Sequence, residues 1–278
     1  MTSVDDLPRS ALLAAWGGAA LRGDVSIARA VRAVQGDDEP HGVELADDPL
    51  LRSCDDLPGL LASLSAAGTA GLRVVLPVPG DLTGLAGPGV VNVEALDAGE
   101  CLLTVGGPPL ALVPVVEAFG SAADTGHLVR WWVHDANVPP PESTSTGDVE
   151  RTLREALAVA TRQLDGLGLG DSSLGRAGAD LAGRLSDVRY GAGPSAALPE
   201  ELPARSRRLL DLAWRVHTIV ELAGEDDGGA VSGWEATRRS RALEGLGAAA
   251  RQAVVAALNA TCSATALSSH DVTPTPGW

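Results

Sequence analysis

The chain has 278 residues, of which 45% are apolar, a formal net charge of −15, and 21 basic residues that are all arginine. Because lysine is absent, chemistries that need a side-chain amine are excluded, among them pyridoxal-phosphate Schiff bases and phosphate loops that end in Gly-Lys. The acidic balance also argues against a nucleic-acid partner, since phosphate binding depends on clustered basic side chains.

Three amphipathic helices are predicted in the first part of the chain. Asp6 and Pro8 are residues that typically start a helix, and the apolar spacing after them predicts a helix to about Leu21. A second helix is predicted over residues 26–35 and a third over 56–67, because apolar residues recur there at helical spacing and a glycine follows each segment.

The hydrophobic pattern then changes to that of strands. Short apolar runs bounded by Gly, Pro or Asp predict four strands, over residues 72–78, 101–105, 110–116 and 128–134. The middle two are joined by Gly106–Pro109, a hairpin-like connection, so part of the sheet should be antiparallel. We therefore predict an α+β domain with about four strands, partly antiparallel and packed by helices.

A proline-rich segment separates this domain from a helical half. Residues 136–147 contain three consecutive prolines and a polar Ser/Thr run, which is typical of a linker. Helical periodicity follows over about 148–164, 175–188, 203–223 and 232–261. We predict an acidic α+β domain over 1–135, a linker over 136–147, an all-α helical bundle over 148–262, and a disordered tail over 263–278. Residues 1–147 hold 7 arginines and 19 acidic residues, a net charge of −12.

The end of the last predicted strand provides candidate ligand-binding residues, namely Trp131, Trp132, His134 and Asp135. Strand alternation places Trp132 and His134 on one face and Trp131 on the other. One interpretation is a pocket in which Trp132 stacks on a ligand and His134, oriented by Asp135, acts as a base or donor. The other is that the tryptophans seal the junction between two domains.

Two arginine clusters stand near the starts of successive predicted helices: Arg205, Arg207 and Arg208, then Arg238, Arg239 and Arg241. If the bundle brings them together, they would bind a phosphate, a carboxylate or an acidic partner. Ion pairs with the acids nearby, or docking against the acidic first half, are the alternatives.

Three patterns resemble metal or cofactor sites, but the sequence around them or the spacing of their residues argues against such a site. His217 and Glu221 lie four residues apart, but no second pair of ligands accompanies them. The glycines of Gly166–Gly170 follow a helix, whereas a dinucleotide fingerprint follows a strand. Asp226–Gly229 lacks the alternating acids of a calcium loop. The cysteines, Cys54, Cys101 and Cys262, show no Cys-x-x-Cys spacing. We predict no catalytic residues, no cofactor and no metal site.

The segment Asp227–Glu235 and the Ala- and Arg-rich helix after it resemble uncharacterised proteins of high-GC actinobacteria, and this resemblance implies no activity. Acidic residues at the start and the lack of a long apolar stretch predict a cytoplasmic protein without a membrane segment. Our first hypothesis is a non-enzymatic interaction or regulatory protein that binds another protein or itself. The alternative is an enzyme or small-molecule-binding protein with a pocket between the two halves near His134.

Overall fold

The computed structural model of the chain describes residues 7–45, 54–85, 87–121, 124–139, 145–165, 193–224 and 233–269. They belong to two compact units. The sheet unit comprises Leu7–Ser143, Ala197–Pro203 and Leu258–Trp278, and the helical unit comprises Met1–Asp6, Thr144–Ala196 and Ala204–Ala257. The predicted helix over 175–188 lies outside the described residues.

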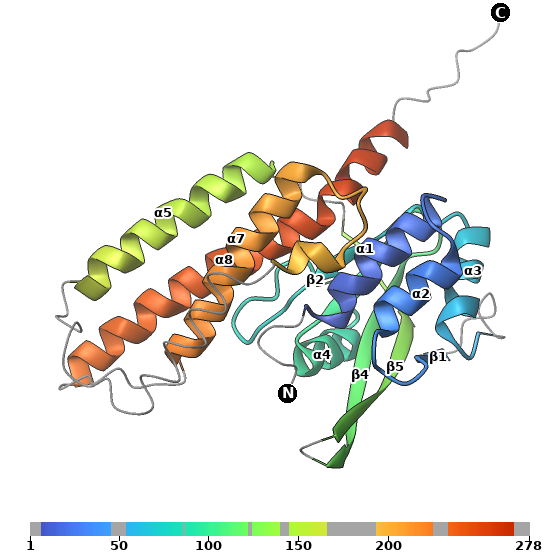
Figure 1. Cartoon of the computed structure of the whole chain (residues 1–278), viewed down its shortest axis with the longest axis horizontal. Coiled ribbons are helices and arrows are strands. Elements are labelled where there is room, and N and C mark those ends of the chain that lie inside the picture. Colours follow the sequence, from blue (N-terminus) through green and yellow to red (C-terminus); the bar gives the residue numbers. More distant parts are fainter. Residues whose placement is uncertain are drawn as a thin grey trace, which may run out of the picture. The chain divides into compact units, whose positions relative to one another are not determined.

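The sheet unit is an α+β structure, as predicted, with five strands where the sequence predicts about four. Its elements are α1 (Arg9–Leu21), α2 (Ile27–Gln35), β1 (Gly42–Leu45), α3 (Leu57–Ala66), β2 (Gly71–Val75), α4 (Gly89–Ala98), β3 (Cys101–Val105), β4 (Leu110–Ser121) and β5 (Asp124–Asp135) (Figure 1). The strand order is β1-β5-β4-β3-β2. β1 is parallel to β5, and the other three pairs are antiparallel.

The first turns of α2 and α3 are capped by nearby side chains, whereas the first turn of α1 is bonded to a residue far away in the sequence. The side chain of Ser26 accepts a hydrogen bond from Arg29 N, and that of Asp56 accepts one from Gly59 N, so α2 and α3 begin at ordinary caps. α1 has no side-chain cap of its own, and Ser10 N instead donates to Glu100 Oε2 at 2.7 Å. Burial raises the pKa of Glu100, although the hydrogen bonds from Ser10 act in the opposite direction.

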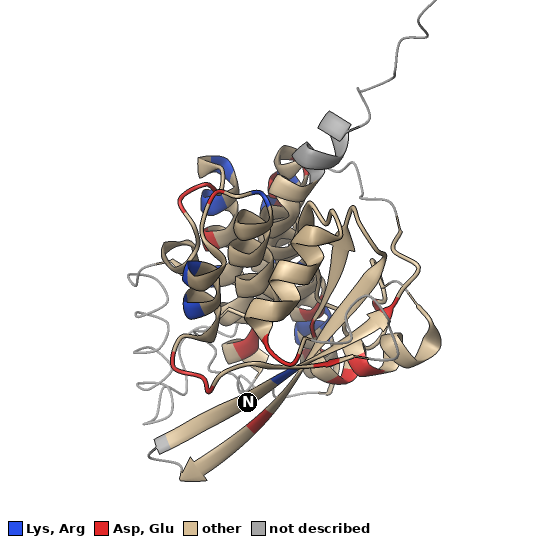
Figure 2. Cartoon of the chain, turned by 90° about the vertical axis from the view of Figure 1, so that its right-hand side faces the viewer, with Lys and Arg blue, Asp and Glu red and all other residues tan. Residues whose placement is uncertain are grey.

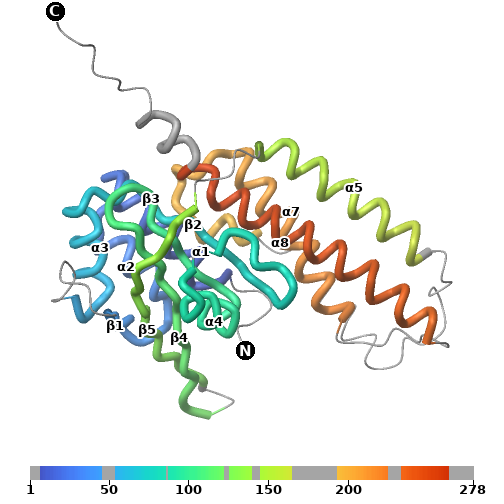
Figure 3. Tube along the Cα trace, turned by 180° about the vertical axis from the view of Figure 1, so that it is seen from behind, coloured from blue at the N-terminus to red at the C-terminus, as the bar shows by residue number. Residues whose placement is uncertain are grey.

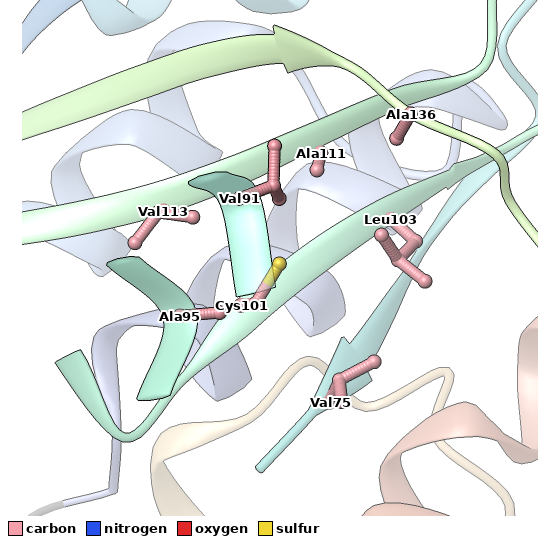
Figure 4. Packing of buried hydrophobic residues seen from close by; sticks show 8 residues of the cluster. All are labelled: Val75, Val91, Ala95, Cys101, Leu103, Ala111, Val113 and Ala136. Atoms are coloured by element: carbon pink, nitrogen blue, oxygen red, sulfur yellow. The ribbon is translucent and has the colours of Figure 1, made fainter. Parts of the chain in front are cut away.

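Helices cover the two faces of the sheet. Gly17 lets α1 approach closely, because a Cβ at this position would lie 3.2 Å from Leu61 of α3 and 3.2 Å from Leu72 of β2. On the opposite face, α4 packs on the sheet through Val91 and Ala95 (Figure 4). The buried cluster there consists of Val75, Val91, Ala95, Cys101, Leu103, Ala111, Val113 and Ala136. We call these the α1 face and the α4 face.

Two elements of the sheet unit were missed by the sequence prediction, β1 and α4. β1 has only four residues and is defined by its pairing with β5. α4 contains three valines, which favour strands, and its N-cap residue Pro88 makes no side-chain cap hydrogen bond. It is helical because Val91 and Ala95, four residues apart, bury one side of the helix against the sheet.

The free edge of β2 is covered by the end of the last helix. Val74 N donates to Asn259 Oδ1 at 2.8 Å, and Asn259 Nδ2 donates to Val74 O at 2.9 Å. Cys262 Sγ donates to Leu72 O at 3.1 Å. The side-chain amide thus takes the place of a neighbouring strand, which satisfies backbone groups that would otherwise lose their hydrogen bonds on burial.

The helical unit contains α5 (Thr146–Asp165), a 3-10 turn η1 (Pro194–Ala197), α7 (Ala204–Gly224) and most of α8 (Gly233–Ser269). α5 begins inside the segment predicted as a linker. α8 continues to Ser269, so the expectation that the last helix ends near Thr261 is wrong, and the first residues of the predicted tail are helical. Residues 270–278 lie outside the described residues. No described helix combines the length and hydropathy needed to cross a bilayer.

Candidate functional site

The strand register places the candidate residues of β5 on opposite faces of the sheet. His134 lies opposite Ala111, and Trp132 lies opposite Val113. Because directly opposed residues of an antiparallel pair share a face, Trp132 and His134 belong to the α4 face. Trp131 is fully buried on the α1 face.

His134 forms a close pair with a residue that sequence reasoning missed. Its Nε2 lies 2.7 Å from Glu94 Oε2, and the two side chains are 14% and 24% exposed. The distance is that of an ion pair, but the angles are not those of a hydrogen bond. The buried atoms Trp132 Nε1, His134 Nε2 and Glu94 Oε2 therefore have no hydrogen-bond partner among the described residues. Glu94 was missed because α4 was not predicted as a helix.

Asp135 does not orient His134 as the sequence analysis expected. It is exposed and lies opposite Leu110 in the β4–β5 ladder. Successive residues of a strand point to opposite faces, so the side chains of His134 and Asp135 diverge. Glu94 of α4 is the carboxylate beside His134.

Trp131 belongs to a closed network on the α1 face. Its Nε1 donates to His41 Nδ1 at 3.2 Å, and His41 Nε2 lies 3.3 Å from Asp38 Oδ2. Because an indole N–H can only donate, His41 Nδ1 must accept, so the ring is neutral and carries its proton on Nε2. Asp38 also accepts two hydrogen bonds from Arg9, at 2.7 and 2.8 Å.

Burial and charge shift the pKa values of this network. Burial lowers the pKa of His41, and this effect outweighs the hydrogen bond and negative charge of Asp38. Burial by itself would raise the pKa of Asp38, but the hydrogen bonds and positive charge of Arg9, together with the hydrogen bond of His41, lower it. His127 Nδ1 lies 3.3 Å from Asp38 Oδ1, so His127 joins the α1 face and does not converge with His134.

A concavity of about 240 Å³ lies beside Arg73 of β2. Arg73 Nη2 donates to Pro139 O at 2.9 Å. The remaining lining is made by Thr104, Val105, Gly106, Gly107, Pro109 and Val138. A guanidinium among backbone and apolar groups suits binding of an anion more than acid–base chemistry, because its pKa is too high for it to exchange a proton.

The first arginine cluster makes contacts within the helical unit. Arg205 lies 3.7 Å from a carboxylate oxygen of Glu150. Arg207 Nη1 donates to the Ser195 carbonyl at 2.7 Å, and Arg208 is exposed. The tryptophan and histidine candidates belong to the sheet unit and these arginines to the helical unit. A pocket that combines the two sets stays a prediction.

The histidine of the helical unit is packed against an aromatic ring. The rings of Trp214 and His217 lie 5.3 Å apart, and burial lowers the pKa of His217 while the charge of Glu221 opposes this. No group of three or more His, Cys, Asp or Glu side chains that could hold a metal ion occurs among the described residues. The glycines 166–170 and the segment 226–229 lie outside them.

Comparison with known proteins identifies the family. A family model described as Rv1486c-like protein, N-terminal domain, matches residues 10–146, and one described as Rv1486c-like protein, C-terminal domain, matches 147–255. The chain belongs to the Rv1486c-like family. The two matched segments meet at the predicted linker.

Mycobacterial relatives match most of the chain. It is 32% identical over 222 residues to "Uncharacterized protein Rv1486c" of Mycobacterium tuberculosis strain H37Rv, an alignment covering 72% of this chain and 75% of that protein. The same values hold for "Uncharacterized protein MT1533" of strain CDC 1551. "Uncharacterized protein MAV321" of Mycobacterium avium is 34% identical over 115 residues, 37% of each chain. No solved structure matches. The predicted resemblance to uncharacterised actinobacterial proteins is confirmed.

Proposed function

We propose that this member of the Rv1486c-like family is a non-enzymatic, cytoplasmic protein-interaction protein that self-associates through the outer part of the β4–β5 hairpin. We call this part, Val116–Ser121 with Asp124–Val129, the hairpin arm. β3 pairs with β4 only at Ala111 and Leu112, near the hairpin base, and β1 pairs with β5 only from Arg130 onward. The arm therefore extends from the sheet as a two-stranded ribbon, without a third strand beside it (Figure 3).

The observation that carries the proposal is an unpaired strand edge. Leu110 N and O make hydrogen bonds with Thr104 Oγ1 of β3, so the backbone groups of Leu110 point away from β5. Backbone groups alternate along a strand, so Val116, Ala118 and Gly120 also direct their N–H and C=O groups away from β5. Among the described residues, these outward groups make no hydrogen bond.

The other described edges of the sheet, including the β5 side of the arm at His127, have cover, which sets the β4 side of the arm apart. Val74 of β2 is bonded to Asn259. On the other side, Glu39 N donates to His127 O at 3.0 Å, and Val43 N donates to Asp55 O at 3.1 Å. An exposed edge that lacks such cover is a template for pairing with another chain.

The β4 side of the arm carries a single charged residue, Glu117, whereas protected edges usually carry several charges (Figure 2). The exposed apolar side chains of the arm are Val116 (38%), Phe119 (44%) and Leu128 (47%). Phe119 lies opposite Gly126, and its ring fills the space that a Cβ at Gly126 would need. A two-stranded ribbon is marginally stable alone, so pairing into four strands would stabilise it.

A second copy fits this edge because antiparallel pairing is self-complementary. With Ala118 on a two-fold axis, Val116 of one copy faces Gly120 of the other, and the three facing pairs exchange about six hydrogen bonds. Pro114, which has no N–H, stays outside this register. The contact is small, so we expect a weak dimer with a Kd on the order of 10 µM or above.

Sedimentation velocity between about 10 and 500 µM tests the proposal, since a weak dimer forms within this range. Ala118→Pro removes an outward N–H and leaves the β4–β5 ladder intact, so it should weaken the dimer at least about tenfold. The matched control, Ala118→Val, keeps the N–H and should dimerise. A wild-type chain that stays monomeric throughout, or a proline variant that dimerises like wild type, refutes the proposal.

A reducing compartment is supported by the cysteines. Cys54, Cys101 and Cys262 are all free and buried. Burial raises the pKa of Cys101 to about 12, which makes its thiol unreactive.

Small-molecule binding near His134 is a second candidate function. The buried atoms Trp132 Nε1, His134 Nε2 and Glu94 Oε2, which lack hydrogen-bond partners among the described residues, favour it. Its test is a ligand screen by thermal shift on wild type and His134→Ala. Ligands that stabilise wild type alone would support this function, and equal shifts in the two proteins would refute it.

A further inference from the structure

The first turns of α8 carry an exposed stripe formed by Trp234, Arg238 and Arg241, which we call the Trp–Arg stripe. Spacings of four and three residues place the three side chains on one side of the helix. Trp234 is 65% exposed, the largest value among the exposed large apolar side chains of the described residues. The Arg238 guanidinium lies over its ring, 5.3 Å from the ring centre.

The two arginines of the stripe have no acidic partner within the described part of the chain. Two exposed arginines elsewhere in the same unit do have one: Arg151 pairs with Asp148, and Arg154 pairs with Glu150. In a protein of net charge −15, the stripe is therefore a local site of uncompensated positive charge.

We propose that the Trp–Arg stripe binds an acidic polypeptide segment. Trp and Arg are the residue types that contribute most binding energy at protein interfaces. A guanidinium stacked on an aromatic ring keeps its N–H groups available for a carboxylate. Carboxylates of the segment bind Arg238 and Arg241, and an adjacent apolar side chain packs against Trp234.

Charge selects a polypeptide over a nucleic acid. A nucleic acid presents a phosphate at every nucleotide and needs an extended basic surface, whereas the stripe offers two arginines. The net charge of −15 repels such a polyanion along its length. A short peptide with a few carboxylates and an apolar side chain matches both the charge and the exposed indole.

Fluorescence anisotropy on the full chain tests this proposal with a fluorescein-labelled peptide of about ten residues in which Glu pairs alternate with Phe. We expect saturable binding that weakens at least about tenfold in the double variant Arg238→Ala, Arg241→Ala, and also in Trp234→Ala. The matched control Arg154→Ala removes an exposed arginine that has an acidic partner, and its affinity should equal that of wild type. Far-ultraviolet circular dichroism checks that each variant keeps its helices.

Other possible ligands of the Trp–Arg stripe, an uncharged peptide and a single-stranded DNA, are tested in the same assay. A peptide with Gln in place of Glu should bind at least about tenfold more weakly. Equal binding of the Gln peptide, tighter binding of single-stranded DNA of equal length, or undiminished binding by the double arginine variant overturns the proposal. Repeating the titration with Ala118→Pro separates this surface from self-association, because that variant should bind the peptide like wild type.

Discussion

Replacing Asn259 by leucine should destabilise the sheet unit by uncovering the edge of β2. The asparagine amide makes two hydrogen bonds with Val74, at 2.8 and 2.9 Å, and Val74 is fully buried. Leucine is a strong helix former, so the change removes the hydrogen bonds while keeping α8.

The expected loss follows from the two backbone groups that are left without partners. An unsatisfied buried donor or acceptor costs about 1–3 kcal/mol, so Asn259→Leu should lower the free energy of unfolding by about 2–6 kcal/mol. At about 2–4 °C per kcal/mol for a chain of this size, that corresponds to a decrease in Tm of about 4–24 °C. Asn259→Asp keeps the acceptor for Val74 N but places a carboxylate oxygen against Val74 O, so it should also destabilise.

Urea unfolding followed by tryptophan fluorescence measures this loss, and hydrogen exchange of the Val74 amide locates it. Gln252→Leu is the matched control, because it replaces an exposed amide on the same helix. It should change the free energy of unfolding by less than about 0.5 kcal/mol. If the two leucine variants unfold at the same urea concentration, the edge-cover argument is wrong.

Three further outcomes are expected. Folding lowers the pKa of His41 below its ordinary value of 6.5, so the neutral ring contributes to stability above pH 6.5 and this contribution is lost as the pH falls through the pKa of the folded state. The urea midpoint of unfolding should therefore decrease on acidification, and it should decrease less in His41→Gln. Glu94→Gln should change the free energy of unfolding by less than about 1 kcal/mol, because its pair with His134 is partly exposed; a larger loss in a urea titration would contradict this. Cys101 should react with iodoacetamide only after unfolding, and mass spectrometry of native protein showing its alkylation would contradict its burial.

Local patterns allowed much of the fold to be predicted from the sequence. Ser26 and Asp56 are caps that act on their own turn of chain, so the starts of α2 and α3 could be read directly. The strand predicted over residues 101–105 coincides with β3. Its end could be predicted because the apolar run stops at Gly106 and Gly107, whose positive φ angles are readily adopted only by glycine. Strand alternation separates Trp131 from Trp132 and His134.

Tertiary contacts decided what the sequence could not. α4 is helical because one side of it is buried on the sheet, and Glu94 reaches His134 only through that packing. The network around Asp38 joins residues from α1, the α2–β1 connection and β5. The sequence by itself determined the helices and strands that have local signals, namely caps, turns and hydrophobic periodicity. The cover of the sheet edges, the hydrogen-bond partners of buried side chains and the shifts in their pKa values depend on residues far apart in the chain, which only the fold brings within hydrogen-bond distance.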